Sequence, residues 1–149
     1  MEEIITEYGI KNFSIKEITQ GQDDIPVEFH SNIIPTICLL QQIRNIIMTP
    51  VFIHSTYRNK EYNTKVAGAK NSLHLVFNAI DFTPFEYDYF TLRRLFEQLC
   101  NGRFNYEVNW KGKQVKVTPE NIGVGLYKTF IHIDTRGLLG RPAPSRWHG

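Results

Sequence analysis

Hydrophobic residues recur at intervals of three and four in two stretches of the chain, which is the spacing of one face of an α-helix. The first stretch follows Ser31, a residue that can cap a helix, and stops before Thr49-Pro50. It places Pro35 in the first helical turn, where proline is tolerated. The second stretch stops at Asn101-Gly102, a typical helix end. The apolar positions are Ile33, Ile37, Leu40, Ile43 and Ile47 in the first helix and Leu92, Leu95, Phe96 and Leu99 in the second.

Other stretches have the short apolar runs or the alternation of apolar and polar residues that is typical of strands. In the last of them Ile131 and Ile133 share one face, while Phe130, His132 and Asp134 share the other. The predicted strands are residues 51–53, 79–82, 104–110 and 130–134, with 114–117 joined to the third by a turn at Lys111-Gly112-Lys113.

The remaining segments predict little regular structure. Ser14 and Glu17 have the spacing of a capping box, which would open one short helix. Residues 59–71 are polar and predict a loop, and the tail from Gly137 predicts coil laid over the domain. Helical patterns among four or five short strands indicate an α+β fold. We expect a single domain over residues 1–149, with a small, mainly antiparallel sheet packed with two or three helices.

Composition and charge exclude several classes of function. A net charge of +2 is too small to argue for nucleic-acid binding. Cys38 and Cys100 both fall within apolar helical patterns, which predicts buried free thiols rather than a disulfide. The N-terminus lacks the features of a secretory signal, and no apolar run has the length of a membrane span. We therefore expect the chain to be made in the cytoplasm.

Four side chains are candidates for chemistry. Arg58 lies just past a predicted strand, a position that commonly lines sites. His74 precedes Asp81 by seven residues, and a carboxylate in a buried strand needs a cation or several donors. Together with His132, the side chains of His74 and Asp81 would form an acceptable three-ligand zinc site with one open coordination position. The spacing also permits ordinary roles: a loop histidine bonded to backbone, a turn carboxylate and a core histidine.

Several short motifs occur in order along the chain. They are Phe13-Ser14-x-x-Glu17, Tyr57-Arg58, Asn63, Gly68-Ala69, Ser72-x-His74, Ala79-x-Asp81, Gly125-Leu126-Tyr127, Phe130-Ile131-His132-Ile133-Asp134-Thr135-Arg136 and Arg146-Trp147. Together they resemble the zinc D-alanyl-D-alanine carboxypeptidase and murein endopeptidase family, which shares its fold with the hedgehog signalling domain and includes phage endolysins. The resemblance covers nearly the whole chain, and the ordered set of motifs is far more specific than any one of them.

The resemblance implies a zinc-dependent peptidase that hydrolyses an amide bond of peptidoglycan stem peptides or cross-links. His74, Asp81 and His132 would be the zinc ligands. Arg58 would bind a carboxylate or carbonyl of the substrate, and Ser72 would donate a hydrogen bond nearby or merely shape its turn. The enzyme would be an endopeptidase or a carboxypeptidase. It would act on the cell wall after release, as a phage endolysin or another wall hydrolase, or as part of a virion.

Three positions depart from the family pattern. Phe77 replaces a glycine, so its side chain must point to the core or narrow the cleft. Thr129 and Phe130 stand where other members carry a glutamate or a histidine as general base. Asp134 lies on the same strand face as His132. It could act as the general base or orient that histidine, and we favour the orienting role. Glu107 is a weaker candidate for the base.

Two other interpretations stay open. A catalytically silent zinc-binding or structural module of the same fold is supported by Phe77 and by Thr129. A small dipeptidase would differ only in its substrate. Tyr57 and Trp147 are expected to wall the cleft, and His54 is expected to pack or to form hydrogen bonds.

Overall fold

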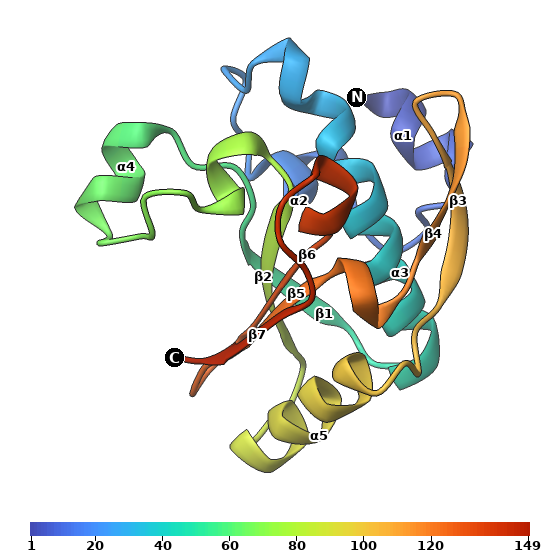
Figure 1. Ribbon diagram of the computed structural model, residues 1–149, viewed down its shortest axis with the longest axis vertical. Helices are drawn as coiled ribbons and strands as arrows, with labels where there is room; N and C mark the ends of the chain where they lie inside the picture. Colours follow the sequence, from blue (N-terminus) through green and yellow to red (C-terminus); the bar gives the residue numbers. More distant parts are fainter.

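The computed structural model describes residues 1–149 and is built around a five-stranded sheet with the strand order β1-β2-β6-β5-β7 (Figure 1). All neighbouring strands are antiparallel except β5 and β7, which are parallel. A separate two-stranded ribbon, β3-β4, is joined by the predicted hairpin turn. The bounds are β1 Val51–Ser55, β2 Ala79–Pro84, β3 Tyr106–Trp110, β4 Lys113–Val117, β5 Gly123–Leu126, β6 Ile131–Asp134 and β7 Ser145–His148.

Five α-helices and four short 3-10 helices accompany the strands. The α+β prediction is therefore confirmed, with more short elements than the pattern indicated. No helix combines the length and the apolar composition that crossing a membrane requires. The α-helices are α1 Glu2–Glu7, α2 Ile15–Thr19, α3 Ile34–Ile47, α4 Lys60–Lys65 and α5 Tyr89–Cys100; the 3-10 helices are η1 Val27–Ile33, η2 Leu73–Val76, η3 Pro119–Asn121 and η4 Arg136–Leu139.

Some predicted helix boundaries hold and one is wrong. The Ser14–Glu17 capping box opens α2, and Pro35 lies in the first turn of α3. Ser31 does not cap α3, because η1 runs directly into that helix and Ile33 occupies the cap position. The carbonyl of Ser31 instead accepts a hydrogen bond from the indole of Trp110, which fastens the β3-β4 ribbon to the start of α3.

Two segments predicted as irregular contain regular structure. Within residues 59–71, Asn59 caps the short helix α4, which projects from the body on the side away from the β3-β4 ribbon (Figure 1). Within the tail after Gly137, β7 pairs with β5 along the edge of the sheet. Neither element has an apolar stripe of its own: α4 buries only Asn63, and β7 is stabilised by pairing with β5, whose residues lie 22 positions earlier.

The main sheet has two unlike faces because side chains alternate along each strand. One face is apolar along β2, β6 and β5 and joins a cluster of buried side chains that includes much of α3 and α5. The other face carries Asp81 on β2 and His132 and Asp134 on β6. The core therefore holds the strands from one side, and the polar residues share the opposite side. The apolar face includes Ile80, Phe82, Val124, Leu126, Ile131 and Ile133.

A buried polar network ties this sheet to α3. Asn78, just before β2, donates its amide to the Asn32 carbonyl at 2.9 Å and to Thr135 Oγ1 at 2.8 Å, and its Oδ1 accepts from the Thr135 amide at 3.0 Å. Thr36 of α3 donates its hydroxyl to the Asn78 carbonyl at 2.7 Å. The start of β2 and the end of β6 are thus fixed to one helix.

Both cysteines are free thiols, as the sequence predicts. Cys38 is buried in α3 and Cys100 is half-buried at the end of α5. Burial raises the pKa of the Cys38 thiol to about 12 and also raises the pKa of Cys100. Both side chains are therefore protonated at neutral pH.

We predict that Asn78→Ala lowers the free energy of unfolding by roughly 3 kcal/mol, because it leaves buried backbone groups of Asn32 and Thr135 without partners. Urea unfolding followed by circular dichroism measures this loss. The matched control is Asn109→Ala, at an exposed position of β3, which should change stability by less than about 0.5 kcal/mol. Equal urea midpoints for both variants would contradict a structural role for the network.

Candidate metal centre

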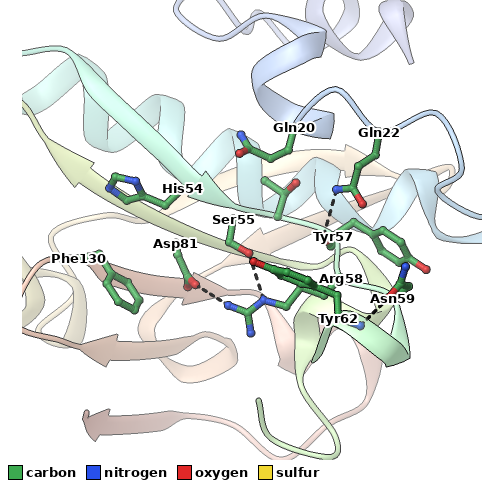
Figure 2. A pocket seen from close by; sticks show the side chains of 11 residues that line it. Gln20, Gln22, His54, Ser55, Tyr57, Arg58, Asn59, Tyr62, Asp81 and Phe130 are labelled. Carbon is green, nitrogen blue, oxygen red and sulfur yellow. Dashed lines mark hydrogen bonds and ion pairs between the residues drawn. The ribbon is translucent and has the colours of Figure 1, made fainter. Parts of the chain in front are cut away.

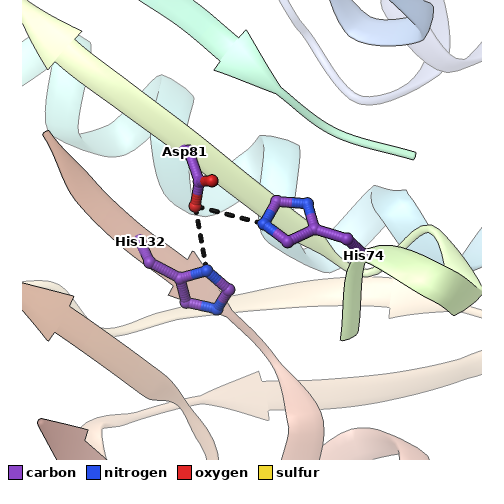
Figure 3. A group of neighbouring side chains, drawn as sticks. All are labelled: His74, Asp81 and His132. Carbon is purple, nitrogen blue, oxygen red and sulfur yellow. Dashed lines mark hydrogen bonds and ion pairs between the residues drawn. The ribbon is translucent and has the colours of Figure 1, made fainter. Parts of the chain in front are cut away.

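Three side chains from separate elements converge on the polar face of the sheet (Figure 3). Asp81 of β2 stands directly opposite His132 of β6, and His74 comes from η2. The Asp81 Oδ1 atom lies 2.9 Å from His132 Nδ1 and 3.2 Å from His74 Nε2. One ligand atom from each residue lies within 4.8 Å of the others, and all three residues are buried. The structure therefore brings together the three residues predicted as metal ligands.

The turn at η2 sets the position of His74. The Ser72 hydroxyl accepts a hydrogen bond from the His74 amide at 3.2 Å, so Ser72 shapes this turn while also lining the neighbouring hollow. Phe77 ends η2 with a φ of +57°, in the left-handed region that favours glycine. Its side chain is fully buried in the core and does not narrow the cleft. Glycine adopts this conformation without strain, which fits the glycine that the resemblance leads us to expect at this position.

The proton on His74 can be assigned from its neighbours. Nδ1 lies 2.6 Å from the Thr56 carbonyl, which only accepts, so Nδ1 carries the proton. Burial lowers the pKa of His74, which leaves the ring neutral and Nε2 with a lone pair. Nε2 has no hydrogen-bond partner and lies 3.2 Å from a carboxylate oxygen that also offers lone pairs. Two buried acceptors facing each other at this distance fit a cation between them.

His132 lies between two carboxylates. Nδ1 contacts Asp81 Oδ1 at 2.9 Å, and Nε2 contacts Asp134 Oδ2 at 2.7 Å. Burial opposes protonation of this imidazole, but the hydrogen bonds to Asp134 and Asp81 outweigh it and raise the pKa of His132 to about 9. Without a metal the ring is therefore an imidazolium. Its Nδ1 proton points to the same carboxylate oxygen that His74 faces.

Asp134 is fully buried and has both oxygens engaged. The guanidinium of Arg136 donates from Nε to Oδ1 at 2.9 Å and from Nη2 to Oδ2 at 2.7 Å. Burial raises the pKa of Asp134, but the hydrogen bonds from Arg136 and His132 outweigh it and hold that pKa below the usual range. A Cβ at Gly123 would lie 2.5 to 2.7 Å from these side chains, so only glycine leaves room for them. The sequence motif includes Arg136, but sequence reasoning gave it no role, although a cation two residues after Asp134 was a signal.

Arg58 reaches Asp81 from just beyond the end of β1 (Figure 2). Its Nη2 lies 3.2 Å from Asp81 Oδ2, and its Nε donates to the Ser55 hydroxyl at 3.2 Å. Burial raises the pKa of Asp81, but the hydrogen bond from His132 and the charge of that imidazolium outweigh it and hold that pKa below the usual range. Arg58 also lines two hollows, one lined by all three residues of the trio and the other by Asp81 alone among them. It is therefore anchored at the site with part of its guanidinium toward open space.

The two hollows have volumes of about 540 Å³ each and share Arg58, Asp81 and Phe130. We call the one toward Tyr57 the arginine hollow and the one toward Trp147 the tryptophan hollow. Trp147 packs 5.0 Å from the His132 ring and donates from Nε1 to the Tyr127 hydroxyl at 2.9 Å. The predicted wall residues thus line the hollows, one on each side.

A close contact explains the spaced asparagine and glycine of the sequence motif. Asn63 of α4 donates its amide to the Ala69 carbonyl at 2.9 Å. A Cβ at Gly68 would lie 2.0 Å from Asn63 Oδ1, so the loop can fold over Asn63 only with glycine there. This loop forms one wall of the tryptophan hollow.

Neither hollow offers a second carboxylate. Asp81 is the one acidic residue that lines either of them. Thr129 contributes a carbonyl that accepts a hydrogen bond from Thr83, and Glu107 lines a different hollow. His54 contacts Thr83 Oγ1 at 2.6 Å through Nε2, which confirms the expected hydrogen-bonding role.

We predict that metal-free protein loses stability as pH rises. The pKa of His132 is about 9 in the folded protein and about 6.5 in the unfolded chain. Protonated His132 therefore contributes fully to the free energy of unfolding below pH 6.5, and this contribution is lost as pH rises through 9. The loss amounts to roughly 3 kcal/mol. Urea unfolding in the presence of chelator measures this loss. The same measurement on His132→Gln gives the pH dependence that comes from the other titrating groups, which is then subtracted. If the two proteins show parallel pH profiles from pH 6 to 10, the imidazolium assignment is wrong.

A comparison with known protein families finds a match, whereas no curated protein matches the chain. The Peptidase M15 family matches residues 11–109, about two-thirds of the chain, a span that includes Arg58, His74 and Asp81 and stops before His132. Members of this family are metal-dependent peptidases. The chain therefore belongs to the Peptidase M15 family.

Proposed function

We propose that the protein is a zinc-dependent peptidase that hydrolyses an amide bond in the stem peptides or cross-links of peptidoglycan. The observation that carries the metal assignment is the buried Nε2 of His74, which lacks a hydrogen-bond partner and faces an Asp81 oxygen. Membership of the Peptidase M15 family supports the peptidase assignment. An endopeptidase and a carboxypeptidase are both compatible with this site.

His74 Nε2, an Asp81 oxygen and His132 Nδ1 would hold the metal. Two imidazoles and a carboxylate are a common ligand set of catalytic zinc, which leaves one position for water. When bound, zinc lowers the pKa of that water and polarises the scissile carbonyl. Metal binding requires His132 to lose its Nδ1 proton, since that nitrogen would become a ligand.

Asp134 and Arg136 orient His132. The Asp134 carboxylate accepts the Nε2 proton, which fixes the tautomer that presents Nδ1 to the metal. Arg136 compensates the buried negative charge of Asp134. Because both Asp134 oxygens are engaged, this role suits the residue better than taking a proton from water.

Arg58 positions the substrate. Its guanidinium is suited to a carboxylate or a peptide carbonyl, and its bond to Ser55 limits its movement. Tyr57 and Trp147 wall the hollows that would receive the two sides of the peptide. The site would thus hold the scissile bond over Asp81, between the two hollows.

The alternative function is a zinc-binding module without catalysis. It is favoured by the absence of a second carboxylate from the hollows and by Thr129 and Phe130 at the family's base positions.

If the protein is the proposed peptidoglycan peptidase, it would serve as a phage endolysin, a virion-associated lysin or another hydrolase of the bacterial wall.

Digestion of purified sacculi tests the proposed function. We expect the protein to solubilise the sacculi, to lose this activity in the presence of a chelator, and to regain it when zinc is added. His132→Ala should lower zinc affinity by more than about 100-fold and abolish solubilisation, since outer partners of zinc ligands alone contribute roughly 10- to 100-fold. His30→Ala is the matched control, because His30 contacts only the Ile25 carbonyl. Stoichiometric zinc in His132→Ala would contradict the ligand assignment, and zinc binding without digestion would favour the silent module.

A second pair of variants distinguishes the orientation of His132 by Asp134 from the binding of substrate by Arg58. Asp134→Asn should lower zinc affinity by about 10- to 100-fold, because the His132 tautomer is no longer fixed by a carboxylate. Arg58→Ala should keep zinc and lose turnover. Zinc affinity comes from competition with a chelator, and turnover from muropeptide mass spectrometry. If Asp134→Asn keeps wild-type zinc affinity and loses only turnover, Asp134 acts as the base.

A further inference from the structure

The sheet face that carries Asp81 continues past the metal centre. Thr83 lies two residues after Asp81 on the same face of β2, and Phe52 of β1 is paired directly with Thr83. Phe85 follows two residues later, its amide bonded to the Pro50 carbonyl at 2.8 Å. Phe85 begins the turn directly after the end of β2 at Pro84. The polar site and these aromatic residues are thus parts of one surface.

A third hollow, of about 310 Å³, lies over this aromatic region. We call it the aromatic hollow; Phe52, Phe85 and Tyr87 line it. Phe130 and His54 line both this hollow and the arginine hollow, so the two hollows are adjacent. Figure 2 shows His54 and Phe130 on one side of Asp81, with Tyr57 and Asn59 on the other. A ligand that occupies the metal site can therefore extend into the aromatic hollow.

The aromatic rings here remain exposed although they lie together. Phe52 is 52% exposed and Phe85 is 48% exposed, and their rings contact edge to face at 6.1 Å. Adjacent exposed aromatic side chains on a soluble protein often mark a binding site. Thr83, His54 and Glu86 line the same hollow. Thr83 Oγ1 and His54 Nε2 bond to each other, whereas the Glu86 carboxylate has no hydrogen bond within the protein. The hollow thus offers apolar ring faces beside hydrogen-bonding groups.

We propose that the aromatic hollow binds a sugar of the glycan strand to which the stem peptide is attached. A pyranose has an apolar C–H face that packs on aromatic rings and a rim of hydroxyl and amide groups that hydrogen-bonds to polar neighbours. The hollow has both kinds of partner and the size of a single small ligand site. This inference rests on the proposed function for the identity of the glycan, while sugar binding itself can be measured without catalysis.

The first test measures binding of a β-1,4-linked N-acetylglucosamine tetramer by NMR titration of labelled protein. We expect chemical-shift changes centred on Phe52, Phe85 and Tyr87. The double variant Phe52→Ala/Phe85→Ala should weaken binding at least about 10-fold. Phe90→Ala is the matched control, because Phe90 is 71% exposed but does not line the hollow. Absence of shifts at this hollow, or unchanged binding by the double variant, would overturn the proposal.

The second test compares substrates with and without sugar. The double variant should digest sacculi at least about 10-fold more slowly than wild type and cleave a sugar-free stem peptide at the wild-type rate. Equal losses on both substrates would mean that the variant disturbs the site, and would overturn the sugar role. Self-association of wild type in sedimentation, abolished in the double variant, would assign the hollow to a second copy. If no substrate is cleaved but the tetramer binds here, the peptidase proposal fails and the sugar site stands.

Discussion

One buried carboxylate organises the candidate site. Asp81 has two imidazoles and one guanidinium within 3.2 Å, and isolated burial of its charge would be very unfavourable. Each partner comes from a different element. His132 and Arg58 compensate the charge of Asp81, and His74 could share a cation with it, only when β2, β6, η2 and the end of β1 all reach their native positions. Compensation of the buried charge of Asp81 therefore depends on the sheet topology that brings these elements together.

The alternation of side chains divides the sheet between two tasks. Residues such as Ile80 and Ile133 lie on the packed face, adjacent in sequence to Asp81, His132 and Asp134 on the other. Tight packing on one side thereby limits movement of the polar groups on the other. Large side chains are accommodated over the polar face because Gly123 and Gly125 leave space, the first for Asp134 and Arg136 and the second for Trp147.

Much of this arrangement could be predicted because its signals are local. His74 and Asp81 belong to one short motif, and strand alternation places His132 and Asp134 on one face. Strand β7 could not be predicted, since its four residues have no apolar pattern and depend on a parallel pairing with β5. The pairing of Asp134 with Arg136 and the bonding of both histidines depend on side-chain geometry that spacing does not specify.

The state of the two cysteines has a consequence for where such a fold can exist. Neither thiol takes part in a crosslink, and burial keeps both protonated, with the Cys38 pKa near 12. The thiolate is the form that oxidants attack, so these sulfurs react slowly. The fold therefore needs no oxidant to form and resists oxidation once formed, which makes the same structure available in reducing and in oxidising surroundings.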